Sequence, residues 1–140
     1  MHQYKQKEIE STMDKLTHNA KIAVVKVLTE IQKADNIVRN KEINYLKDVM
    51  LSFSLSDKNI HEVNNIPTSE AISIIKELPE EEKSEIAKMM GRMIVVDEDI
   101  NYNEVKLYNS FCESCGIKSS FNIDEYPEYS LSGYFTNPTD

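Results

Sequence analysis

The 140-residue chain has no tryptophan, three glycines, four prolines, two cysteines and three histidines. A β protein of this length needs many tight turns, and the shortage of glycine and proline argues against one. Two cysteines are too few for a disulfide framework, so we expect reduced thiols and a cytoplasmic location. The histidines, His2, His18 and His61, form no i, i+4 pair of the kind that binds metal on a helix.

Long apolar runs and positive charge are also scarce. No run approaches the roughly 20 apolar residues of a membrane span, and the first twelve residues lack the apolar core of a secretion signal. The 24 acidic residues outnumber the 16 basic ones, which gives a net charge of −8. Such a surface repels phosphate backbones, so nucleic acid is not an expected partner. Divalent cations and basic protein surfaces are the electrostatically favoured partners.

Helical periodicity dominates what is present. Apolar residues recur at spacings of three and four, which predicts a compact all-α bundle of about seven helices in a single domain. We expect residues 1–19 to be a polar segment or short helix, 20–117 the helical domain, and 118–140 an aromatic-rich, partly ordered extension. Within the domain the expected helices cover about 20–34, 40–53, 57–64, 68–78, 80–95 and 105–115.

An acidic stretch repeats at a distance of 62 residues. Asp35 and Asp97, Val38 and Ile100, and Glu42 and Glu104 are each separated by this distance. The apolar positions on both sides of the two stretches match at the same shift. We therefore predict two helix–turn–helix hairpins packed about a pseudo-two-fold axis.

This pattern resembles the tellurite-resistance TerB-like family over 21–117. The shared features are an Ala-Asp or apolar-Asp pair at the end of a helix, an aliphatic residue three positions later and a glutamate seven positions later. The resemblance implies a divalent cation, Ca²⁺ or Mg²⁺, bound by Asp35, Glu42, Asp97 and Glu104. It also implies a role in stress or tellurite resistance. The family usually places glycine after the aspartate, whereas this chain has Asn36 and Glu98.

The same carboxylates have a structural interpretation. Asn101 and Glu104 have the spacing of a capping box, in which each side chain bonds to the other's backbone. An acidic residue in the first turn of a helix stabilises it by about 0.3–1 kcal/mol without any ligand. In the first repeat Arg39 takes the cap position, where arginine is a poor cap. Capping therefore explains the second glutamate better than the first.

An EF-hand is a further interpretation of the second stretch. Asp97, Asp99, Asn101 and Asn103 take loop positions one, three, five and seven, but Tyr102 and Tyr108 replace the required glycine and glutamate. The Cys112-x-x-Cys115 pair falls at apolar positions of a helix without further zinc ligands, which predicts buried thiols. We find no nucleophile–base arrangement or phosphate-binding loop.

We therefore expect a non-enzymatic cytoplasmic binding module with an unidentified protein partner. One hypothesis adds a divalent cation at the acidic turns. The other is a metal-free interaction or scaffold domain that docks a partner on an acidic face.

Overall fold

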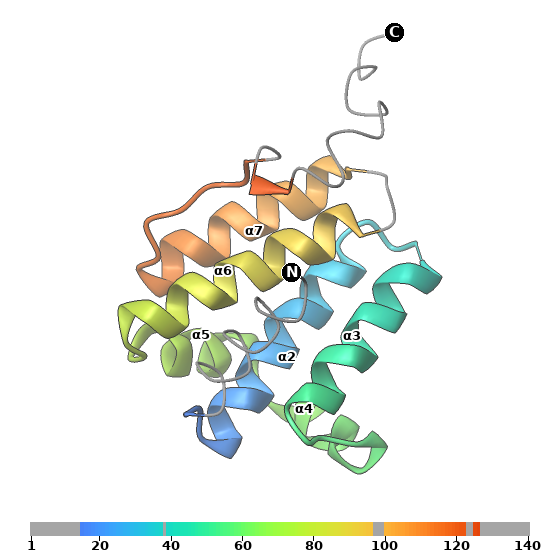
Figure 1. The fold of residues 1–140 in the computed structure, drawn as a ribbon, viewed down its shortest axis with the longest axis vertical. Coiled ribbons are helices and arrows are strands. Elements are labelled where there is room, and N and C mark those ends of the chain that lie inside the picture. The colour runs from blue at the N-terminus through green and yellow to red at the C-terminus, as the bar shows by residue number, and fades with distance from the viewer. Residues whose placement is uncertain (1–14, 38, 97–99, 123–124, 127–140) are drawn as a thin grey trace, which may run out of the picture.

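The computed structural model describes residues 15–37, 39–96, 100–122 and 125–126, and all regular structure in these ranges is helical. The elements are α2 (His18–Lys33), α3 (Asn40–Ser52), the 3₁₀ helix η1 (Asp57–Asn59), α4 (Ile60–Asn65), α5 (Thr68–Lys76), α6 (Glu80–Val95) and α7 (Tyr102–Cys115). The all-α prediction is confirmed (Figure 1). The described ranges hold six α-helices; the further helix that we predicted belongs to 1–19, of which only 15–19 are described.

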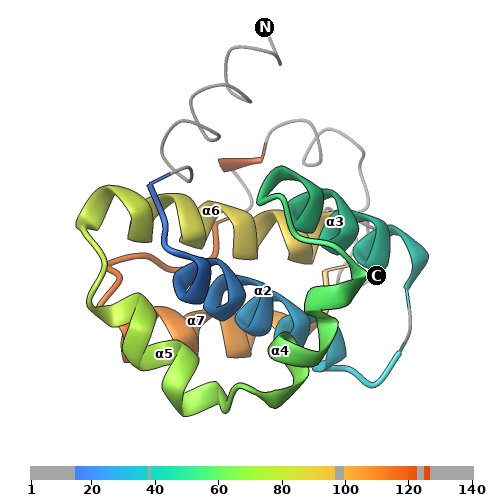
Figure 2. The ribbon, with the colours of Figure 1, turned by 90° about the horizontal axis from the view of Figure 1, so that it is seen from below.

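Helix α2 is the centre of the bundle. Figure 2 shows α3 and α6 on one side of it and α4 and α5 on the other, and α7 also contacts it. Its residues are therefore buried nearly all round: Ala20, Ile22, Ala23, Val24, Val25, Val27, Leu28, Ile31 and Gln32. The β-branched residues of this run favour strands, but a helix surrounded by other helices buries them equally well.

The starts of three helices are capped in different ways. Residues 57–64 form a 3₁₀ turn followed by α4, because the side chains of Ser56 and Asn59 bond to each other's backbone and tighten the first turn. At α5 the cap residue is Pro67, and no side chain bonds to the backbone there. Pro79 likewise precedes α6 as its cap and is not its first helical residue.

The 62-residue repeat is confirmed in the helix boundaries. Shifting α2 by 62 residues gives 80–95, the bounds of α6, and shifting the start of α3 gives residue 102, the start of α7. Each pair packs as a hairpin, α2 contacts α6, and the outer helices cross over, so that α3 contacts α6 and α7 contacts α2. This reciprocal packing is what a pseudo-two-fold axis produces.

The two hairpins also end in the same way. Ser54 and Gly116, 62 residues apart, have φ angles of 60° and 73°, in the left-handed region. The next residue in each repeat returns a hydrogen bond to its helix, from Leu55 N to the Met50 carbonyl at 2.7 Å and from Ile117 N to the Cys112 carbonyl at 2.8 Å. This is the Schellman ending, which satisfies a free carbonyl and places a buried aliphatic residue after the helix.

None of the described helices has the length and apolar character that crossing a membrane requires. The three methionines of α6, Met89, Met90 and Met93, are buried in the core.

Candidate acidic-turn site

The first acidic turn is organised around Asp35. This residue directly follows Ala34, the C-cap of α2, and its carboxylate Oδ1 accepts a hydrogen bond from Ile37 N at 3.0 Å. Asn36 lies between them with φ of 60°, a left-handed conformation that asparagine tolerates better than most residues. The Asp35 side chain therefore shapes the turn that reverses the chain toward α3.

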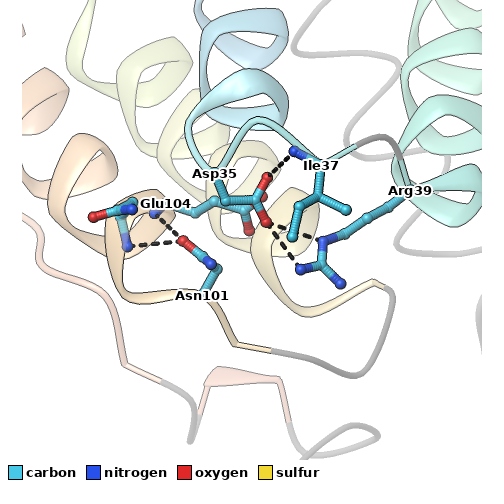
Figure 3. Close-up of polar contacts among 6 residues, drawn as sticks. Asp35, Ile37, Arg39, Asn101 and Glu104 are labelled. Atoms are coloured by element: carbon cyan, nitrogen blue, oxygen red, sulfur yellow. Dashed lines mark hydrogen bonds and ion pairs between the residues drawn. The ribbon is translucent and has the colours of Figure 1, made fainter.

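The other carboxylate oxygen of Asp35 is bound by Arg39. Oδ2 accepts from Nε at 3.1 Å and from Nη2 at 2.9 Å (Figure 3). The side chain of Asp35 is 3% exposed and that of Arg39 17%, so water screens this ion pair poorly. Arg39 is the N-cap residue of α3 and makes no cap bond to the helix with its side chain. Through this ion pair Arg39, although a poor cap, links the start of α3 to the end of α2.

The two repeated glutamates are at the start of α3 and α7. Glu42 and Glu104 are each the third residue of their helix, and both are fully buried. Side chains in the first turn of a helix are usually solvated. Their burial shows that the turns pack into the bundle, whereas a capping role alone would leave them at its surface.

Asn101 caps α7 as predicted. Its side-chain oxygen accepts from Asn103 N at 2.8 Å and from Glu104 N at 3.2 Å. Figure 3 shows the Glu104 side chain extending from this cap toward the end of α2, where Asp35 lies. Two of the four predicted ligands, from different repeats, therefore approach the same end of the bundle.

The predicted cation site is only partly described. Asp97 lies outside the described residues, as do Glu98 and Asp99. Among the residues that the structure describes, no three His, Cys, Asp or Glu side chains come close enough together to hold a metal ion. The sequence analysis named Arg39 only as a poor cap and missed its ion pair with Asp35. The pair could have been predicted, because a basic residue four positions after an acidic one on a helical turn has the spacing of a close ion pair.

A groove of about 400 Å³ lies beside the first acidic turn. It is lined by Ala34 at the end of α2 and by the first three turns of α7, through Asn103, Lys106, Leu107 and Ser110. Two large apolar residues close in sequence to this lining are exposed: Ile37 by 51% and Tyr102 by 74%. This end of the bundle therefore presents apolar as well as polar surface.

The Cys112-x-x-Cys115 pair is buried, as predicted, and its two thiols form no disulfide. Burial raises the pKa of the Cys112 thiol to about 11 and also raises the pKa of Cys115. The Cys115 thiol faces the Ile72 carbonyl at 3.9 Å. Thiols of raised pKa carry little of the reactive thiolate near neutral pH, so core packing accounts for both residues.

The sequence matches no protein-family model and no curated protein. Among solved structures, the fold is similar to the crystal structure of a protein of unknown function from Porphyromonas gingivalis W83. The TM-score is 0.64 at 21% sequence identity, and the match covers 83% of this chain and 97% of that one. At this identity the similarity establishes the fold and assigns no function.

Proposed function

We propose that this protein is a non-enzymatic interaction module that binds a basic segment of a protein partner without a metal ion. The observation that supports the metal-free choice is the state of Asp35. Its two carboxylate oxygens already accept hydrogen bonds from Ile37 N and from the Arg39 guanidinium. A cation at this carboxylate would have to displace one of these donors or share an oxygen with it, and the partly buried positive charge of Arg39 beside the site opposes both.

Charge supports the choice of a basic partner. The chain carries a net charge of −8. The corner between α5 and α6 concentrates exposed carboxylates at Glu77, Glu80 and Glu81. The Glu80 side chain is 82% exposed and can meet a partner, although the Lys83 ammonium, 3.9 Å from its carboxylate, offsets part of its charge. A lysine- or arginine-rich segment is the complementary ligand for this corner.

The test is retention of a partner on the immobilised full-length chain. We expect a protein that is held at 50 mM KCl and released at 500 mM, because interactions between exposed charges are screened by salt. The double variant Glu77→Lys, Glu80→Lys should lose that protein. The variant Asp48→Lys, Asp57→Lys makes the same change in net charge at other exposed sites and should keep it. Equal loss in both variants would show that net charge alone drives retention and would refute a docking site at this corner.

The second candidate function is cation binding, as the TerB-like resemblance implies, together with its link to stress or tellurite resistance. It is supported by the repeat itself. A glutamate occurs at the same position of both hairpins, and in both it is fully buried, which a solvated helix start does not require. The all-α fold and the paired hairpins are in keeping with that resemblance.

Thermal unfolding distinguishes the two candidates. We expect the same midpoint in EDTA and in millimolar Ca²⁺, Mg²⁺ or Mn²⁺ at fixed ionic strength. A cation present at about 100 times its dissociation constant stabilises the folded state by about 2.7 kcal/mol, which raises the midpoint of a domain of this size by several degrees. Such a rise for one cation, abolished by Asp97→Asn, would favour the cation function over the metal-free one.

A further inference from the structure

Gly91 is a helical glycine that the helix itself does not require. It lies within α6, where glycine is less favourable than alanine, and its equivalent in the first repeat is Thr29, an ordinary helical residue. A methyl group at Gly91 would overlap the phenol oxygen and the ring carbon Cζ of Tyr126. The absence of a side chain at this position thus creates a notch on α6 that a tyrosine ring from the C-terminal segment fills.

Tyr126 is held in this notch by several contacts. It is 3% exposed, and its hydroxyl donates to the Lys88 carbonyl at 3.3 Å. Its ring stacks on that of Phe121, with centroids 6.2 Å apart and planes inclined by 17°. Phe121 in turn meets the ring of Tyr108 edge to face, at 5.9 Å and 81°. An aromatic row therefore runs from α7 to the notch on α6.

Phe121 and Tyr126 belong to the segment after α7, residues 117–122 and 125–126, which we term the strap. In Figure 1 it runs back alongside α7 from the end of that helix. Polar contacts join it to α7: Phe121 N donates to Asn109 Oδ1 at 3.1 Å, and the Tyr108 and Ser119 hydroxyls are 3.1 Å apart. Apart from a short 3₁₀ turn, the described part of the strap has no regular secondary structure, so side-chain contacts position it.

Next to the docked ring, a cavity of about 370 Å³ lies between the strap and α6. Its lining comes from both sides: Glu80, Ser84, Ala87 and Lys88 of α6, Tyr108 of α7, and Ile117, Lys118, Ser119, Glu125 and Tyr126 of the strap. One wall of the cavity exists only while the strap lies in place. Burial raises the pKa of the Tyr126 hydroxyl, so the docked ring is neutral at physiological pH.

We infer that the strap is a latch, in which insertion of the Tyr126 ring into the notch at Gly91 holds the strap in place as a wall of the cavity beside α6, and withdrawal of the ring removes that wall and opens the cavity. The closed state buries the ring row of Tyr108, Phe121 and Tyr126. The open state uncovers the notch and the faces of α6 and α7 beneath the strap, while the two hairpins and their core stay folded. The latch requires no cation, and its cavity shares one residue, Glu80, with the corner proposed to dock a partner.

Hydrogen exchange of the full-length chain tests the latch through Gly91→Ala. The added methyl expels the phenol, so we expect amide exchange of the strap to accelerate by roughly tenfold or more, while amides of α2 keep their protection. A matched pair in the Tyr126→Ala background supplies the control. In that background the new methyl group meets no ring, and alanine is the better helix former, so Gly91→Ala should leave the midpoint of thermal unfolding unchanged or raise it. In the wild-type background Gly91→Ala should lower this midpoint.

Chemical rescue provides a second measurement. Millimolar p-cresol should raise the unfolding midpoint of Tyr126→Ala by filling the notch, and should not do so for the Gly91→Ala, Tyr126→Ala double variant. The inference is overturned if Gly91→Ala shifts the midpoint equally in both backgrounds, if α2 and the strap lose protection together, or if p-cresol stabilises the two variants alike.

Discussion

Truncation of Leu28 to alanine is expected to lower the free energy of unfolding by about 3–5 kcal/mol, and Met90→Ala by about 2–5 kcal/mol. Both residues are fully buried, and they are equivalent in the two repeats, 62 positions apart on α2 and α6. Each truncation removes apolar surface that no solvent can reach and leaves a cavity where the two hairpins meet. Urea unfolding followed by circular dichroism gives both values.

Leu51→Ala is the matched control for this pair. Leu51 is on α3 and is 71% exposed, so its truncation is expected to change the free energy of unfolding by less than about 1 kcal/mol. The reciprocal packing of the hairpins requires both core variants to be strongly destabilised. A cost below about 1 kcal/mol for either of them would contradict a core shared between the two repeats.

The fold was predictable because the buried side chains of each helix recur in the sequence at helical spacing. The apolar face of α2 recurs in α6 with the same spacing, so the helices and their repeat follow from the positions of residues such as Leu28 and Met90. Exact helix starts were less predictable. At α5 the cap position is Pro67, which makes no side-chain bond, although the polar residues Thr68 and Ser69 next to it offer the usual capping chemistry.

The site was less predictable than the fold, because its decisive contacts lie across turns and between distant segments. Asp35 carries the same charge whether it binds a cation or Arg39, and only the geometry of the turn distinguishes the two. The burial of Glu104 depends on how α7 packs against α2. Gly91 and Tyr126 are 35 residues apart, and no local pattern connects a helical glycine to a tyrosine beyond the next helix.

Asp35→Ala is expected to lower the free energy of unfolding by about 2–4 kcal/mol in EDTA, where no cation can contribute. The change removes an acceptor from Ile37 N and leaves the Arg39 guanidinium, 17% exposed, without this carboxylate. Asp35→Asn keeps an oxygen for Ile37 N and loses only the ion pair, so its effect should be smaller, about 1–2 kcal/mol.

A double-mutant cycle with Arg39→Ala isolates the contribution of the pair. The two side chains are in direct contact, so their mutations should not be additive. The sum of the losses in unfolding free energy caused by Asp35→Ala and Arg39→Ala should exceed the loss in the double variant by about 1–3 kcal/mol. Additive effects would mean that the ion pair does not stabilise the turn. A larger cost of Asp35→Ala in Ca²⁺ than in EDTA would instead assign Asp35 to a cation. Coupling that is unchanged by Ca²⁺ supports the view that Arg39 already supplies the positive charge that the turn requires.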